Sequence, residues 1–182
     1  SGIMAAELAR AGLTGPETSF EGRFGLFRSF AGDPDAADRF AGELATLGRR
    51  WRLREVAYKF YPCCHYIHPF IEAGRLLQDR GVTAEDVESL VLYVPHGASG
   101  IICEPWDTKL AVKSGHAMRW SLPLVFASQI VHGQVDLDTF ERLPDARVKQ
   151  LAARIAWQPM QETAFPQRFE AAVECRLLDG DV

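Results

Sequence analysis

The stretch Tyr58-Lys59-Phe60-Tyr61-Pro62-Cys63-Cys64-His65-Tyr66-Ile67-His68-Pro69-Phe70 concentrates a cation, aromatic rings, two thiols and two imidazoles in one short segment. Val56 to Phe60 has the pattern of a strand, and Pro62 ends it because proline has no N–H for a central sheet position. His68-Pro69 predicts the start of a helix, since proline is tolerated in the first helical turn. A helix N-terminus attracts anions through its free N–H groups and its dipole. The segment therefore predicts an anion site, with Lys59 as an added positive charge, although such a cluster is also typical of a simple buried turn.

The flanking segments predict an α+β fold. The chain is Ala-rich up to Arg50, and from Trp51 onward it is richer in β-forming residues. Strands and helices mix without a regular βαβ repeat, which favours a two-layer sheet-and-helix domain over a doubly wound sheet. We therefore expect a short all-helical segment in residues 1–50 and an α+β domain in residues 51–182. The expected elements are helices at 3–10, 35–47, 68–81, 122–132 and 145–154, strands at 51–60, 87–94, 155–157 and 169–177, and a loop at 96–106.

Composition and charge exclude several classes of function. The net charge of −4 argues against a nucleic-acid partner, because such proteins carry a basic surface. The longest apolar runs, such as 122–130, are interrupted and too short to span a membrane. The four cysteines form no CxxC pair, which favours reduced thiols and a cytoplasmic protein. The chain begins inside a helix-like run and stops after a turn signal, so we expect a fragment of a longer protein.

Two kinds of chemistry fit the thiols and imidazoles of the central stretch poorly. Structural zinc sites use ligand pairs separated by two to four residues, and the adjacent Cys63 and Cys64 cannot readily both face one tetrahedral ion. We therefore expect no metal. Thiol catalysis needs a cysteine of low pKa beside a base. Cys64, next to His65 and near a helix N-terminus, meets this condition only in part, and free cysteines are more often small buried apolar residues.

Recognition of a polycarboxylate fits the sequence better. Ser114 to Ser121 forms a second cationic loop, with Ser121 as the expected N-cap of the helix at 122–132 and Gly133 as its end. Two such loops that face one cleft would bind a substrate with two or three carboxylates. By contrast, Lys109 and Lys113 are expected to be solvated. The candidate substrate-binding residues are Cys64, His65, His116, Arg119 and Ser121.

The motif Lys59-Phe60-Tyr61-Pro62-Cys63-Cys64-His65-Tyr66-Ile67-His68-Pro69 resembles the signature of the MmgE/PrpD family. Residues 5–16 and 21–25, and the Trp120-Ser121-Leu122-Pro123 helix start, resemble other family segments in the same order along the chain. This family includes 2-methylcitrate dehydratase, cis-aconitate decarboxylase and iminodisuccinate epimerase. The resemblance implies a large all-helical domain, of which residues 1–50 would be the end, and an α+β lid domain from residue 51.

The resemblance also implies a mechanism. Family enzymes remove a proton α to a carboxylate without a cofactor, and they act as homodimers. Lys59 matches the family's active-site lysine, and His68 matches the later histidine of the motif, so these two are the candidate catalytic residues. Cys64 stands where some members, the decarboxylase among them, carry a histidine, which favours a dehydratase-like activity. The isolated fragment is expected to be inactive, and a non-catalytic carboxylate-binding or regulatory module remains the alternative.

Overall fold

The computed structural model describes residues 1–33 and 35–180, and its contacts divide the chain into two compact units, Ser1–Ala57 and Tyr58–Val182. The domain boundary proposed near Arg50 lies N-terminal to this division. Among the described residues, no helix is both long enough and apolar enough to cross a membrane.

The first unit is helical and has little buried interior. Its aromatic contacts join Phe20, Phe27 and Phe40, whose ring centroids lie 5.3–6.5 Å apart. Neither of its two α-helices contains a buried residue. A small aromatic cluster and exposed ion pairs therefore hold this unit together, in place of a closed core. Its elements are α1 (Gly2–Arg10), the π-helix η1 (Phe27–Ala31), α2 (Ala36–Leu44) and the 3₁₀-helix η2 (Arg52–Glu55).

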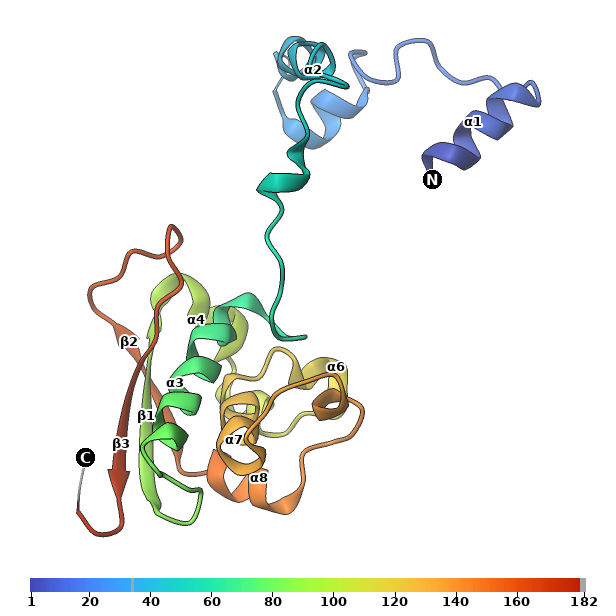
Figure 1. Cartoon of the computed structure of the whole chain (residues 1–182). Coiled ribbons are helices and arrows are strands. Elements are labelled where there is room, and N and C mark those ends of the chain that lie inside the picture. The colour runs from blue at the N-terminus through green and yellow to red at the C-terminus, as the bar shows by residue number, and fades with distance from the viewer. Residues whose placement is uncertain (34, 181–182) are drawn as a thin grey trace. The chain divides into compact units, whose positions relative to one another are not determined.

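The second unit contains a three-stranded mixed sheet with the order β2-β1-β3 (Figure 1). The central strand pairs parallel with β2 and antiparallel with β3. One face of the sheet is buried through residues such as Leu90, Leu92 and Cys175, whereas Glu174 and Arg176 on the other face are exposed. This alternation is typical of a sheet that packs against one layer. The strands are β1 (Val87–Pro95), β2 (Ile155–Met160) and β3 (Ala172–Leu177).

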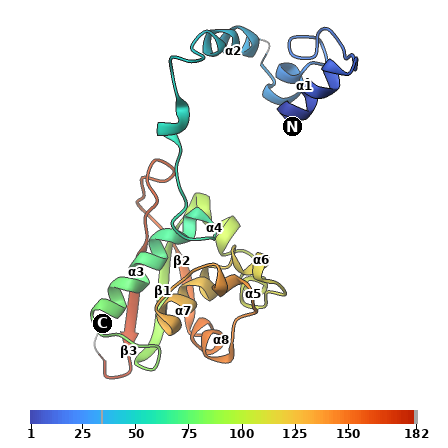
Figure 2. The same ribbon diagram turned by 45° about the vertical axis from the view of Figure 1, so that its right-hand side comes forward.

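Helices α3 and α7 pack against each other and supply the layer that covers the sheet (Figure 1, Figure 2). Phe70, Ile71 and Gly74 are the buried residues of α3, as the sequence spacing predicts. Gly74 lies against Gln129, where a Cβ atom would approach the glutamine side chain to 3.1 Å. The helical elements of the second unit are η3 (His65–Ile67), α3 (His68–Asp79), α4 (His96–Ile102), α5 (Trp106–Leu110), α6 (Gly115–Met118), α7 (Leu122–His132), η4 (Asp138–Phe140) and α8 (Ala146–Ala152).

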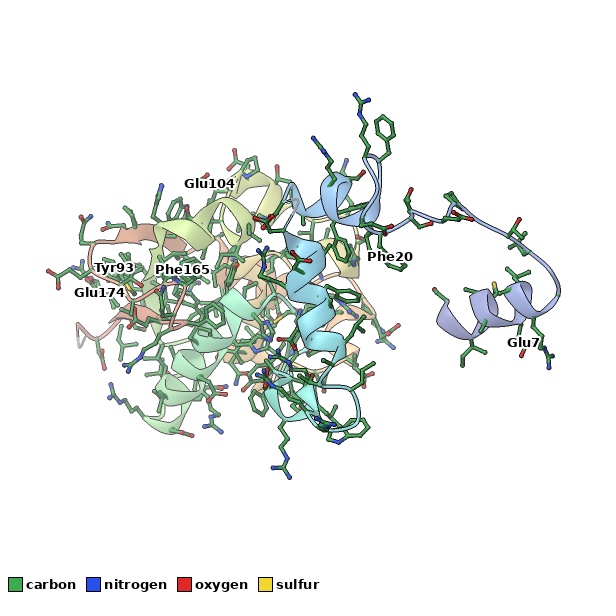
Figure 3. All side chains as sticks on the ribbon, turned by 90° about the horizontal axis from the view of Figure 1, so that it is seen from above. Glu7, Phe20, Tyr93, Glu104, Phe165 and Glu174 are labelled. Carbon is green, nitrogen blue, oxygen red and sulfur yellow. The ribbon has the colours of Figure 1, made fainter. Side chains whose placement is uncertain are left out.

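The structure confirms the α+β class: a helical segment is followed by a small mixed sheet with helices. It also confirms the helices that start at His68 and Leu122 and the strands at 87–94 and 155–157. On the solvent face, the Tyr93 hydroxyl donates a hydrogen bond of 3.0 Å to Glu174 across β1 and β3, and Figure 3 shows both side chains together. The sheet therefore combines a packed inner face with polar pairing on its outer face.

Two predicted elements are wrong. Residues 51–60 form no strand: all of them are exposed, and η2 occupies part of the segment. Residues 96–102 form α4 instead of a loop, although this segment contains Gly97 and Gly100. Gly97 permits close packing there, because a Cβ atom would lie 2.6 Å from the ring of Phe165 and the ring would have to shift. Figure 3 labels Phe165, which reaches this position from the loop between β2 and β3.

Candidate functional site

The two cationic loops predicted from the sequence meet at one pocket in the second unit. This pocket has a volume of about 240 Å³. Its lining includes three basic side chains and no carboxylate, so its potential favours an anion. The lining residues are Lys59, Pro62, Cys63, Cys64, His116, Arg119 and Trp120.

A backbone hydrogen bond joins the two loops that form the pocket. The Cys64 N–H donates to the Arg119 carbonyl at 3.0 Å. A backbone bond of this kind fixes the spacing of both loops independently of side-chain rotamers, so the pocket has a defined width. Lys59 and Arg119, which lie far apart in the sequence, therefore belong to one site.

Lys59 lies where the first loop enters the unit. Its Nζ donates to the Cys63 carbonyl at 3.0 Å, which leaves two of its three N–H donors for other acceptors. The same side chain also lines a neighbouring hollow of about 450 Å³, together with Tyr61, Pro62 and residues 135–137. The ammonium group is thus tethered to the turn and still open to a ligand on the pocket side.

The two thiols of the pocket are poor nucleophiles. Cys63 and Cys64 are only 2% and 6% exposed. Burial raises the pKa of Cys63 to about 12 and also raises the pKa of Cys64. Both thiols are therefore protonated near neutral pH, where a thiolate would be needed for attack. This geometry disfavours thiol catalysis and makes both side chains part of the pocket wall.

His68 is not among the side chains that line the pocket. Its ring makes edge contacts with Tyr61 at 5.2 Å and with His65 at 4.9 Å, measured between centroids. Its Nε2 is buried and has no hydrogen-bond partner among the described residues. Burial lowers the pKa of His68, and the neighbouring His65 lowers it further. The imidazole is therefore neutral near pH 7, and its position suits support of the 61–64 turn better than direct contact with a substrate.

The lowered pKa of His68 predicts a pH dependence of stability. The unfolded chain binds a proton at the ordinary value of 6.5, whereas the folded chain resists protonation. The unfolding free energy should therefore decrease as the pH falls below about 6.5. Urea unfolding at pH 7.5 and pH 5.5 should show a smaller decrease for His68→Gln than for the unmodified chain. If the exposed His96→Gln variant also showed a smaller decrease, by the same amount, the pH dependence could not be assigned to His68.

The second loop is built by two serine caps. Ser114 Oγ accepts a hydrogen bond from the Ala117 N–H at 3.1 Å and begins α6, which carries His116. Ser121 Oγ accepts from the Leu124 N–H at 3.3 Å and donates to the Lys109 carbonyl at 2.7 Å. Because Ser121 is completely buried and does not line the pocket, its hydroxyl serves the fold, and we leave it out of the site proposed below.

His65 also lies outside the pocket. Its ring contacts His68 and stacks at 6.2 Å on Phe169, in an aromatic group that includes Tyr66 and Phe165. This group lies where the loop between β2 and β3 meets η3. His65 thus contributes to packing in this structure, whereas Cys64, His116 and Arg119 remain with Lys59 in the pocket.

Sequence reasoning missed Trp120 as part of the pocket and misjudged Lys109. Trp120 directly precedes the Ser121 cap, and its partly exposed indole supplies a wall and an N–H donor. Lys109 is partly buried: its Nζ donates to the Ile101 carbonyl at 2.5 Å, and burial lowers its pKa. The expectation that Lys109 is solvated was therefore wrong. The position of Trp120 beside a helix N-cap was a usable signal, but nothing local marked Lys109.

The described residues include no group of three or more His, Cys, Asp or Glu side chains that could hold a metal ion. In the structure, the pocket lining combines basic side chains with proline, cysteine and tryptophan. The donor set thus suits carboxylates, which accept hydrogen bonds from ammonium and guanidinium groups.

The fold and the pocket define a small α+β domain with a cationic, anion-accepting site. A comparison with protein families identifies this domain: the model of the MmgE/PrpD C-terminal domain matches residues 61–182. The chain therefore belongs to the MmgE/PrpD family, which contains dehydratase- and isomerase-like enzymes, and the predicted resemblance is confirmed. A search of curated proteins gave no match.

Proposed function

We propose that this chain is part of a cofactor-independent enzyme that removes a proton α to a carboxylate of a di- or tricarboxylate, in a dehydratase-like reaction. The observation that carries the proposal is the pocket in which Lys59, His116 and Arg119 converge without a lining carboxylate. Removal of an α-proton places negative charge on the substrate carboxylate, and preorganised cations stabilise that charge in the transition state. The family assignment of the domain supports this class of reaction.

Each pocket residue has a proposed role. Lys59 retains two free donors and serves as the electrostatic stabiliser or proton carrier for the reacting carboxylate. Arg119 and His116 hold a second carboxylate, and the thiols with Trp120 form the apolar wall. His68 supports the 61–64 turn, so we now propose it as a positioning residue. As the resemblance implies, we also propose that residues 1–50 end an all-helical domain and that the complete enzyme is a cytoplasmic homodimer.

The first test measures binding by the chain itself. In ¹H–¹⁵N correlation spectra, tricarballylate should cause saturable shifts in both pocket loops, at Cys64, His116 and the Trp120 indole. The affinity should decrease with added salt because the binding is electrostatic. Tricarballylamide, which has the same skeleton without charge, should cause no shifts. Binding of tricarballylate elsewhere on the domain, with both loops unchanged, would contradict the proposed site.

A second test separates the enzyme from the alternative, a non-catalytic carboxylate-binding or regulatory module. The full-length protein that carries this chain should be incubated with di- and tricarboxylates in D₂O and monitored by ¹H NMR. Loss of the α-proton signal with formation of an unsaturated product indicates a dehydratase, and exchange without net turnover indicates an isomerase. Binding with no exchange for any substrate that saturates the pocket would favour the module.

A further inference from the structure

Arg119 has a neutral partner outside the pocket. Its guanidinium carbon lies 5.2 Å from the centroid of the Phe140 ring, on η4. Its Nε is buried and has no hydrogen-bond partner among the described residues. We propose that Phe140 is a positioning residue that holds the Arg119 guanidinium at the edge of the anion pocket. This inference rests on the proposed function of the pocket and extends it to a residue that does not touch the ligand.

A ring suits this task better than an acidic side chain. A carboxylate partner would neutralise the guanidinium and compete with the substrate for its donors. The face of an aromatic ring attracts the cation through its quadrupole and leaves the net charge and the N–H donors available. The contact also restricts a long side chain that would otherwise lose rotamer freedom when the ligand binds. Phe140 therefore preorganises Arg119 while the pocket keeps its positive charge.

The ring is itself held firmly. Phe140 is 5% exposed, and a reciprocal cap stabilises the start of its segment. The Asp136 N–H donates to Thr139 Oγ1, and the Thr139 N–H donates to Asp136 Oδ1, both at 3.0 Å. The backbone of η4 also contacts α6 closely at Gly115, where a Cβ atom would lie 1.8 Å from the Phe140 carbonyl oxygen. The segment that carries the Phe140 ring is thus packed tightly against α6, the helix that carries His116.

A double-mutant cycle tests the inference. Phe140→Leu keeps an apolar side chain but removes the ring face, and it should weaken tricarballylate binding about 5-fold. In an Arg119→Gln background, the same substitution should have no further effect, because the cation is already absent. Phe140→Tyr keeps the ring and should restore most of the affinity. An equal loss from Phe140→Leu in both backgrounds would show a merely structural role and overturn the proposal.

A measurement on the unmodified chain tests the contact between Arg119 and Phe140 even if the variants fail to fold. The ring current of Phe140 should shift the Arg119 Hδ and Hε resonances upfield, and Arg119 resonances at ordinary positions would overturn the inference. The two proposals fail separately. If the unmodified chain binds no polycarboxylate while the upfield shifts are present, the proposed function fails. If it binds tricarballylate and Phe140→Leu binds equally well, the positioning role fails.

Discussion

Replacing Lys59 by alanine is expected to weaken tricarballylate binding at least about 10-fold, because a charge-assisted hydrogen bond is lost from the pocket. The fold should change little. Lys59 is exposed, and its hydrogen bond to the Cys63 carbonyl contributes about 1 kcal/mol. Isothermal titration and thermal unfolding of the same samples measure both quantities. In the longer enzyme proposed above, the same substitution should lower kcat strongly with little change in Tm.

Two comparisons sharpen the Lys59 experiment. Lys113→Ala removes the same charge from an exposed position outside the pocket, so it should leave the affinity nearly unchanged. Lys59→Arg keeps the positive charge but replaces the compact ammonium by a planar fork, and it should bind with an intermediate affinity. If Lys59→Ala and Lys113→Ala lost the same affinity for tricarballylate, the effect would come from the net charge of the chain and not from the pocket. An unchanged kcat in Lys59→Ala would remove this residue from the mechanism.

Replacing Gly115 by alanine is expected to give the largest loss of stability. The new Cβ atom would lie 1.8 Å from the Phe140 carbonyl oxygen, and a backbone atom cannot move aside as a flexible side chain can. Relief requires α6 and η4 to separate, so we expect a loss of about 3 kcal/mol, at the upper end of the range for overpacking. Urea unfolding measures this loss, and Tm should decrease by roughly 10 °C.

The same separation should weaken the pocket, because α6 carries His116 and Arg119 follows it. Gly100→Ala is the matched control: Gly100 lies inside α4, and an added Cβ atom meets no atom within 4 Å. That control should stabilise the chain by about 0.5–1 kcal/mol, since alanine favours a helix interior. If Gly115→Ala were as stable as Gly100→Ala, the close contact between the backbones of α6 and η4 would be contradicted.

Local signals in the sequence predicted several elements well. Ser121, Pro123 and Gly133 mark the start and the end of α7, and the structure has the N-cap and the left-handed C-cap at these positions. The run of β-forming residues from Val87 predicted β1, which Pro95 ends. These signals succeed because a cap, a proline or a glycine acts on the backbone within a few residues of itself.

The two wrong elements show where local reasoning failed. Residues 51–60 have strand-forming side chains, but a strand needs a neighbouring strand, and none of the three described strands pairs with this segment. Gly97 suggested a loop, yet it allows Phe165 to pack closely on α4 from far along the chain. In both cases the deciding partner is distant in sequence.

Residue types and short spacings were enough to predict the family, the α+β class and the two cationic loops. The set of side chains that share the pocket is visible only in the three-dimensional fold. In the fold, the Cys64 N–H bonds to the Arg119 carbonyl, and the Arg119 guanidinium lies over the Phe140 ring. The Ser121 hydroxyl bonds to the Lys109 carbonyl and does not reach the pocket. The physical reason is that burial and packing depend on contacts between distant segments, which no local pattern encodes.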